Sequence, residues 1–239
     1  MVTIGVIGCG WLGKPLAMYL RQKHQVQCYS RKAQTDTDLE YSINPAPDNP
    51  FWTNEIFIIS ISTKDNYLRT LKGILQNTPS NSSIILMSST SVYKEFEEEV
   101  NEDALITQKS IQKEAEELVT SLKADVLVLR LGGLMGEDRI AGKWKSASAY
   151  ADGPVNYIHA DDVINIVAQM IEKKITNGLF NLVAPLHPLR SVIHQKNAKT
   201  FGFQTKEYNR TTGRSVNSNK LIKALAYEFI HPDPLLFWT

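Results

Sequence analysis

A glycine turn directly after an apolar run constrains this chain more than any other feature. The run covers residues 2–7, and the next six residues are Gly8-Cys9-Gly10-Trp11-Leu12-Gly13. A buried parallel strand that turns on Gly8 and opens into a helix points backbone N–H groups and the helix dipole at a diphosphate. In such a turn Gly10 lets the backbone approach the diphosphate, and Gly13 lets helix and strand pack closely. The segment therefore predicts a dinucleotide-binding site.

The pattern G-x-G-x-x-G alone also arises as a chance glycine turn. Here an apolar strand precedes it, and Leu12, Leu16 and Leu20 follow at the fourfold spacing of a helix face. Pro15 lies close enough to the helix start to be tolerated. The combination of strand, turn and helix favours a binding site over chance.

Short apolar runs alternate with helical patterns along most of the chain. The expected strands cover residues 2–7, 25–30, 55–61, 82–88, 125–131 and 178–183, and the expected helices cover 11–23, 64–76, 107–122 and 161–171. The connection at 36–50 is too short and too interrupted by prolines for a full helix, and it has room for a short strand near 41–43. This alternation predicts an α/β fold, with a Rossmann-type doubly wound parallel sheet covered on both faces.

Two parts of the chain are expected. Residues 1–135 with 151–185 form the dinucleotide-binding core, and residues 136–150 with 186–239 form a small C-terminal substrate lobe. Because ligands bind at the carboxyl edge of an open α/β sheet, a substrate pocket is expected between that edge and the lobe. The apolar residues 235–238 either close the lobe or contact a second subunit of a homodimer, and closure is favoured.

Composition argues against nucleic acid and membranes as partners, which leaves a small-molecule substrate. The 26 basic and 25 acidic residues leave a formal charge of +1, which gives no electrostatic footprint for nucleic acid. No stretch has the length of a membrane span, and no basic region precedes the first strand, so we expect a cytoplasmic protein without membrane anchor or signal peptide. Cys9 and Cys28 are the only cysteines and are expected to be reduced, with Cys9 an inert small residue rather than a redox switch.

The residues after the second expected strand bear on the cofactor. A carboxylate there would hold the adenosine ribose hydroxyls of NAD, and a basic group would accept the 2′-phosphate of NADP. This chain has Ser30, Arg31 and Lys32, a hydrogen-bond donor followed by two cations. The pattern favours NADP over NAD, although Arg31 and Lys32 also fit ordinary surface charges after a strand.

Five further segments resemble those of the short-chain dehydrogenase/reductase superfamily, in its extended branch of NAD-dependent epimerases and dehydratases. Each is a weak signal alone, and their order and spacing carry the resemblance. They are Ser88–Tyr93, Val128–Gly136, Tyr157–Val163, Gly178–Val183 and Ser218–Leu221. The resemblance implies an oxidoreductase acting on a small carbonyl or sugar-nucleotide substrate, with Ser89 orienting the substrate oxygen.

The same family uses a tyrosine and a lysine four residues apart on one helix face. The lysine holds the nicotinamide ribose and lowers the pKa of the tyrosine, which exchanges a proton with the substrate while hydride moves. Lys113 matches the lysine, but Lys109 occupies the tyrosine position, and no tyrosine occurs between Tyr93 and Tyr150. The chain thus resembles the atypical members of the family, which keep the fold and often the cofactor.

Each remaining candidate has two interpretations. Ser89 either positions a substrate hydroxyl or stabilises a serine-rich turn. Lys109 is either a substitute acid beside Lys113 or, as we favour, an exposed lysine. Ser62 either lies beside the cofactor through its backbone or is an ordinary strand-end serine. Tyr93 either approaches the vacant tyrosine site from the strand-end loop or, as we favour, packs structurally.

One histidine and two aspartates stand close together in His159-Ala160-Asp161-Asp162. They suggest a metal cluster, but a turn with an aspartate as helix N-cap is favoured, so no metal is expected. The function expected from all these features is a dinucleotide-dependent oxidoreductase. The alternative is a sensor without catalytic activity that responds to bound NADP(H). A structural relic without cofactor is least favoured, because the glycine motif is intact.

Overall fold

The structure of the chain is a computed structural model. It describes residues 1–30, 39–43, 45–63, 66–94, 96–136, 138–143, 149–211 and 213–238. For residues 30, 40, 43, 149, 150 and 209–211 it describes the backbone only.

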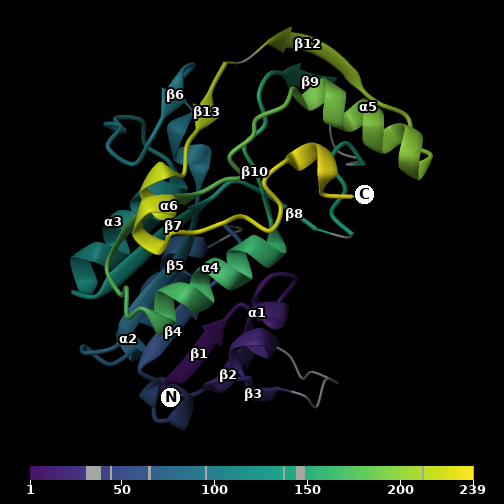
Figure 1. The fold of residues 1–239 in the computed structure, drawn as a ribbon. Coiled ribbons are helices and arrows are strands. Elements are labelled where there is room, and N and C mark those ends of the chain that lie inside the picture. Colours follow the sequence, from purple (N-terminus) through teal and green to yellow (C-terminus); the bar gives the residue numbers. More distant parts are fainter. Residues whose placement is uncertain are drawn as a thin grey trace. The chain divides into compact units, whose positions relative to one another are not determined.

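Seven strands form the main sheet (Figure 1). They are β1 (Thr3–Ile7), β2 (Gln25–Ser30), β3 (Glu40–Ile43), β4 (Ile56–Ile59), β5 (Ser83–Ser89), β7 (Val126–Leu131) and β11 (Gly178–Leu182). Their order is β11-β7-β5-β4-β1-β2-β3, and β1 lies parallel to both β2 and β4. This is the strand order of the doubly wound dinucleotide-binding fold, which confirms the predicted fold class. The order reverses at β1 and β4, where such sheets bind their ligands.

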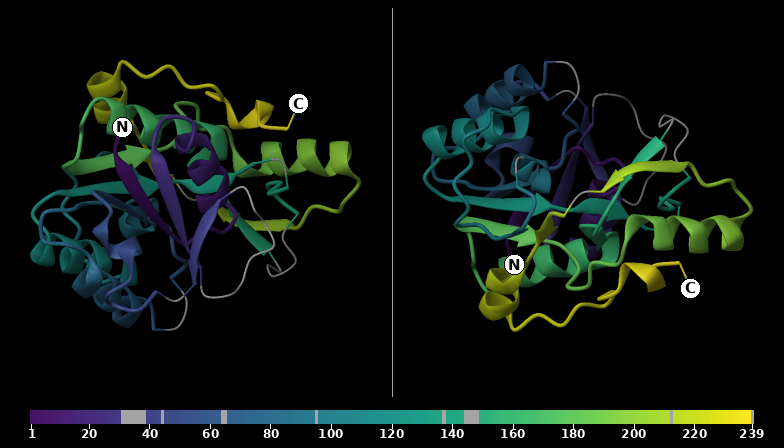
Figure 2. Two further views of the ribbon diagram at one scale, coloured as in Figure 1. Left: turned by 90° about the horizontal axis from the view of Figure 1, so that it is seen from below. Right: turned by 90° about the horizontal axis from the view of Figure 1, so that it is seen from above.

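The helices of the sheet bury an apolar stripe against the strands. α2 (Tyr67–Asn77) and α3 (Ile111–Leu122) lie side by side in Figure 2 and share a core with alternate residues of the strands. Leu71 and Val119 of these helices are fully buried with Phe57 and Leu86 of the sheet. α1 (Gly13–Leu20) buries Leu16 fully. The fourfold spacing of apolar side chains therefore produced the expected amphipathic helices.

Three helices begin later than the sequence indicates, and one of them is α2, which begins at Tyr67 instead of 64. α1 covers 13–20 instead of 11–23, because Gly8 to Leu12 form the turn itself. α3 begins at Ile111 instead of 107, because Ser110 is its N-cap and accepts a hydrogen bond from the Lys113 N–H at 3.2 Å. Serine with a free N–H three residues on is a preferred helix start.

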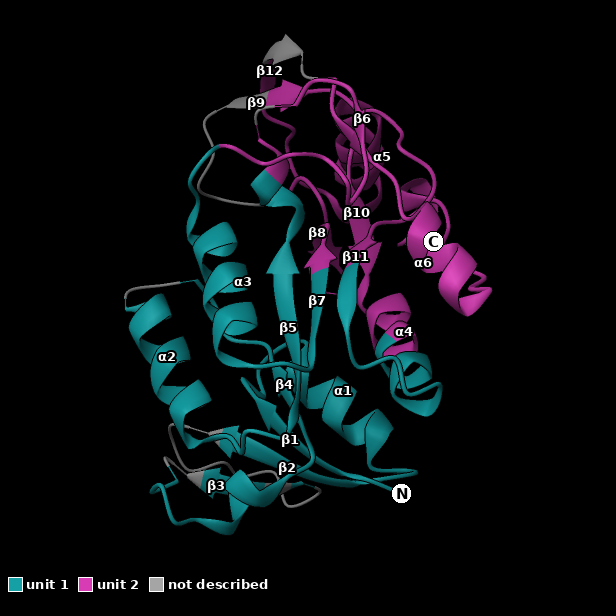
Figure 3. Cartoon of the chain, turned by 90° about the vertical axis from the view of Figure 1, so that its left-hand side faces the viewer, with its two compact units in different colours: residues 1–92, 108–129, 167–179 teal, residues 93–107, 130–166, 180–239 magenta. Residues whose placement is uncertain are grey.

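The chain divides into two compact units (Figure 3). Unit 1 contains residues 1–92, 108–129 and 167–179, and unit 2 contains residues 93–107, 130–166 and 180–239. α4 (Ala160–Glu172), β7 and β11 have residues in both. The part of the chain that the structure describes has no helix long and apolar enough to cross a membrane.

Unit 2 contains three short strand pairs and the C-terminal segment. The pairs are β8 (Gly133–Met135) with β10 (Tyr157–His159), β9 (Ala149–Asp152) with β12 (Glu207–Thr211), and β6 (Glu99–Val100) with β13 (Ser215–Val216). Unit 2 also contains α5 (Arg190–Phe201), α6 (Asn219–Leu225) and the single turn η3 (Pro234–Leu236). Of the other two single turns, η1 (Pro50–Thr53) lies in unit 1, and η2 (Thr90–Tyr93) has its first three residues in unit 1 and its last in unit 2. Phe237 packs in the core of unit 2, and the Trp238 indole N–H donates to the Gly136 carbonyl at 2.9 Å. The C-terminal residues thus pack within unit 2, as the favoured interpretation expects.

Candidate functional site

The three glycines of the turn after β1 meet different surroundings. Gly8 has a φ of +98°, and a Cβ there would lie 2.4 Å from the Ser60 carbonyl oxygen. A Cβ on Gly13 would lie 2.2 Å from the Gly8 carbonyl oxygen. Around Gly10, by contrast, no described atom lies within 4 Å of the position that a Cβ would take. The turn is packed tightly on both sides of one open backbone surface, which is the shape that a diphosphate needs.

The N-terminus of α1 faces the same turn. Its N-cap residue is Leu12, whose side chain makes no capping hydrogen bond and is buried. The first N–H groups of a helix have no acceptor within the helix. In α1, however, the Lys14 N–H donates to the Gly10 carbonyl at 3.0 Å and Pro15 has no N–H, so an anion could be bound only by N–H groups closer to the turn. The side chain of Leu12 packs in the core, which leaves only its backbone to face a ligand.

The two cysteines correct one expectation. Cys9 of the turn and Cys28 of β2 form a disulfide, with Cα atoms 5.9 Å apart, instead of two reduced thiols. Cys28 lies opposite Val6 in the register of β1 and β2, so Cys9, three residues after Val6, comes within the range of a disulfide. A separation of 19 residues gives no sign of this pairing, which depends on strand register.

The residues expected to choose between NAD and NADP lie at the end of β2. The structure gives the backbone of Ser30 as the last residue of that strand. The Ser30 side chain, Arg31 and Lys32 lie outside the residues that it describes. The preference for NADP therefore stays a prediction.

A pocket of about 270 Å³ opens beyond the carboxyl ends of β4 and β5, within unit 1. Its lining is part polar and part apolar and brings together two predicted site residues, Ser62 and Ser89. The lining residues are Ile61, Ser62, Thr63, Tyr67, Met87, Ser88, Ser89 and Gln112. A second hollow, of about 570 Å³, includes Thr3 and Gln25 and so lies at the opposite ends of the strands. The carboxyl edge is the side where such sheets bind ligands, so the smaller pocket is the candidate substrate site.

The contacts of Ser89 fit both of its predicted roles, which are to position a substrate hydroxyl and to stabilise a turn. It lines the pocket, and its Oγ accepts a hydrogen bond from the Ser91 N–H at 3.1 Å. The hydroxyl can still donate its own hydrogen to a bound molecule while accepting this bond. Stabilising the turn and orienting a ligand are therefore compatible roles.

Neither candidate lysine lines the pocket. Lys113 Nζ lies 3.1 Å from Glu117 Oε1, one turn along α3. Lys109 is exposed and precedes the first residue of α3, so the two lysines do not share a helix face. The helix residue that does line the pocket is Gln112.

Sequence reasoning missed Tyr67 in this pocket. It is the first residue of α2 and is almost fully buried. Burial, assisted by the negative charge of Glu116, raises the pKa of Tyr67 to about 12. The hydroxyl therefore stays protonated at neutral pH and can donate a hydrogen bond to a ligand oxygen. Its position just after β4, at the carboxyl edge, is the signal that could have identified it.

Tyr93 packs structurally, as expected. It is fully buried in unit 2, where its hydroxyl accepts from Arg130 at 2.7 Å and donates to Asn181 Oδ1 at 2.9 Å. Burial raises its pKa although Arg130 opposes the shift. A buried arginine and a buried tyrosine satisfy one another here, which is the arrangement that buried polar groups require.

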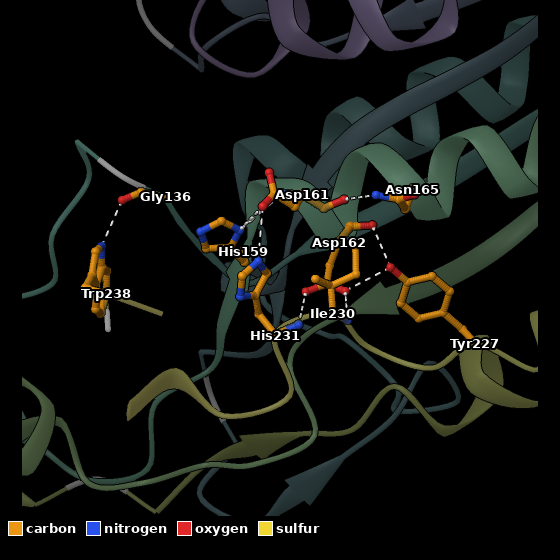
Figure 4. A network of polar contacts seen from close by, with 9 residues as sticks. All are labelled: Gly136, His159, Asp161, Asp162, Asn165, Tyr227, Ile230, His231 and Trp238. Carbon is orange, nitrogen blue, oxygen red and sulfur yellow. Dashed lines mark hydrogen bonds and ion pairs between the residues drawn. The ribbon is translucent and has the colours of Figure 1, made fainter. Parts of the chain in front are cut away.

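The two aspartates of α4 do not cap it, because the helix begins at Ala160 and both lie in its first turn. Asp162 is fully buried and accepts from the Tyr227 hydroxyl at 2.8 Å and from the N–H groups of Ile230 and His231 at 2.8 and 3.1 Å (Figure 4). The expected N-cap role was thus wrong. Asp162 instead fixes the segment that precedes η3.

Three comparisons place this geometry among known proteins. Residues 3–112 match the NAD binding domain of 6-phosphogluconate dehydrogenase. The chain is 24% identical to Protein YeeZ of Escherichia coli strain K12, over 99% of this chain and 98% of that protein.

Solved structures with the same fold cover almost the whole chain. One is a putative NAD-dependent epimerase/dehydratase from Methylobacillus flagellatus, at 22% identity and a TM-score of 0.80, covering 99% of this chain and 96% of that one. Another is a human epimerase family protein solved with NADPH, at 13% identity and a TM-score of 0.73, covering 98% of this chain and 97% of that one.

Proposed function

Because the chain has the fold of NAD-dependent epimerases and dehydratases of the short-chain dehydrogenase/reductase type, we propose that it binds NADP(H) at the Gly8–Gly13 turn. The observation that carries the proposal is the open backbone at Gly10 between two tightly packed glycines. The N–H groups of Leu12 and Gly13, just ahead of Lys14 and Pro15, would hold the diphosphate. Trp11 and Leu12 contribute through the backbone of the same turn.

We further propose that Ser30, Arg31 and Lys32 select NADP over NAD. A 2′-phosphate carries the charge and acceptor oxygens that a guanidinium fork and an ammonium bind best. Titration of the chain with NADPH and with NADH tests this directly. We expect tighter binding of NADPH, with the difference reduced in Arg31→Ala; equal binding of the two cofactors would refute the preference.

The pocket at β4 and β5 is proposed to hold a small carbonyl or sugar-nucleotide substrate. The bound nicotinamide would supply hydride transfer, and the chain would orient the substrate. Ser89 and Tyr67 are the donors for a substrate oxygen, and Ser62 lies beside the cofactor. Lys113 is kept as a candidate for the nicotinamide ribose, and Lys109 as a weak candidate acid. Oxidation or reduction across a panel of such compounds supports this role, and tight cofactor binding without turnover on that panel counts against it.

A second function is favoured by the positions of the lysines. Because Lys113 faces Glu117 and Lys109 precedes α3, the described residues place no lysine ammonium in the pocket. The chain would then be a sensor without catalytic activity that reports bound NADP(H) to a partner or to a second copy of itself. A change in oligomeric state or partner binding on adding NADPH, without turnover, supports the sensor.

We also propose a cytoplasmic location, in keeping with a role that depends on NADP(H). Thiols are normally reduced in that compartment, so the proposal requires that the Cys9–Cys28 disulfide of the structure be open in the cell. Thiol-blocking during cell lysis tests the proposal, because recovery of the chain with Cys9 and Cys28 fully joined would argue for an oxidising compartment.

A further inference from the structure

Outside the dinucleotide site, three side chains of unit 2 converge on one point (Figure 4). His159 ends β10, Asp161 is the second residue of α4, and His231 lies in the segment before η3. Each offers one ligand atom, and these atoms all lie within 4.8 Å of one another. His231 is 70 residues away from Asp161 in the sequence, so only the folded chain brings it into the cluster.

The spacing of the donor atoms matches a metal site. Asp161 Oδ2 lies 3.3 Å from His159 Nδ1 and 3.1 Å from His231 Nε2. Two ligand atoms bound to Zn²⁺ at about 2.0–2.1 Å in a tetrahedral arrangement lie about 3.3 Å apart. Two imidazole nitrogens and one carboxylate oxygen are also a ligand set that zinc accepts.

The cluster is held in place by contacts that do not use its donor atoms. The His231 backbone N–H is bound by buried Asp162, and the two imidazole rings lie against one another, tilted by 40°, with centroids 3.9 Å apart. Phe237 contacts both rings, at centroid distances of 5.4 and 6.0 Å. Fixed ligand orientation of this kind is what raises the affinity of a metal site.

The burial of the three residues leaves a route for an ion. His159 is 7% exposed at its side chain, whereas His231 is 27% and Asp161 is 55% exposed. The Asp161 backbone N–H also lies 3.3 Å from His159 Nδ1, a long hydrogen bond that a metal would replace. A short nitrogen–oxygen contact needs a proton or a cation between its atoms. The cluster is therefore held either by protons on the imidazole nitrogens or by a metal ion.

We propose that His159, Asp161 and His231 bind one divalent transition-metal ion of the Zn²⁺ class, with a fourth position open to water. Binding displaces the protons that otherwise join the carboxylate to the imidazoles. All three ligands lie in unit 2, whereas the Gly8–Gly13 turn lies in unit 1.

Calorimetric titration of the full chain with Zn²⁺ tests the site, with Co²⁺ absorption as a second readout of coordination. We expect one equivalent to bind, with proton release, and the affinity to fall at least tenfold in Asp161→Asn and in His231→Ala. His187→Ala is the matched control, because that imidazole contacts the Val155 carbonyl and lies outside the cluster. It should bind zinc as the unchanged chain does.

Two results would overturn the proposal. One is the absence of saturable zinc binding to the folded chain, which would leave only hydrogen bonds between the three side chains. The other is unchanged affinity in both Asp161→Asn and His231→Ala, which would place the ion elsewhere. Circular dichroism of each variant, together with NADPH binding, separates loss of the ligand from loss of the fold.

Discussion

The three glycines of the turn are required for different physical reasons. Gly8 needs a positive φ and, like Gly13, a close approach to backbone atoms, so either substitution forces the backbone to move. Gly10 meets open space. A side chain there disturbs a ligand rather than the fold. A substitution at Gly10 therefore affects binding, whereas a substitution at Gly8 or Gly13 affects folding.

The disulfide between Cys9 and Cys28 provides a prediction at the same scale. A disulfide that closes a loop across 19 residues stabilises the folded state by about 3 kcal/mol, because it restricts the unfolded chain. Cys28→Ser should therefore lower the free energy of unfolding by about that amount. Urea unfolding without reductant measures the loss. Adding a dithiol to the unchanged chain should produce a similar drop. Equal stability with and without the dithiol, or two reactive thiols in the unreduced unfolded chain, would contradict the pairing.

Sequence reasoning at the residue scale succeeded where the chemistry is local. The need for glycine at three positions follows from a strand, a turn and a helix that are adjacent in the chain. The disulfide and the role of Tyr67 depend on strand register and on a pocket between elements. No local pattern encodes either of them.

At the scale of elements, periodicity located the strands and helices, but the start of α3 depended on one capping serine. Moving that start from 107 to Ile111, with Ser110 as the N-cap, removes Lys109 from the helix and with it the shared face with Lys113. A difference of four residues at a helix end therefore changed the chemical interpretation. Helix ends are the least reliable part of any such prediction.

The segment that precedes η3 depends on Asp162 in a way that can be measured. Asp162→Ala leaves the Tyr227 hydroxyl and two backbone N–H groups without their buried acceptor, so the free energy of unfolding should fall by about 2–4 kcal/mol. Tyr227→Phe removes one of these bonds and should cost about 1 kcal/mol. Thermal or urea unfolding gives both values. Equal losses in the two variants would show that Asp162 does not hold the backbone of this segment.

At the scale of the whole molecule, the sheet order, with its reversal at β1 and β4, determines where a ligand belongs. Alternating strand and helix patterns predicted the fold class, and the order of five motif segments pointed to the fold that the solved epimerase structures share with this chain. Contacts between distant segments were not predicted. His231 beside Asp161 and the three donors on Asp162 come from the C-terminal residues, whose sequence has mixed patterning.

The central claim is that the Gly8–Gly13 turn binds NADP(H), and Gly10→Val tests it most directly, with Gly73→Val as the matched control. Both glycines have open space where a Cβ would stand, so both variants should fold, but only Gly10 lies in the turn. We predict that calorimetric titration with NADPH shows binding to the unchanged chain and to Gly73→Val, and at least a tenfold loss in folded Gly10→Val. Undiminished NADPH affinity in Gly10→Val would contradict the assignment.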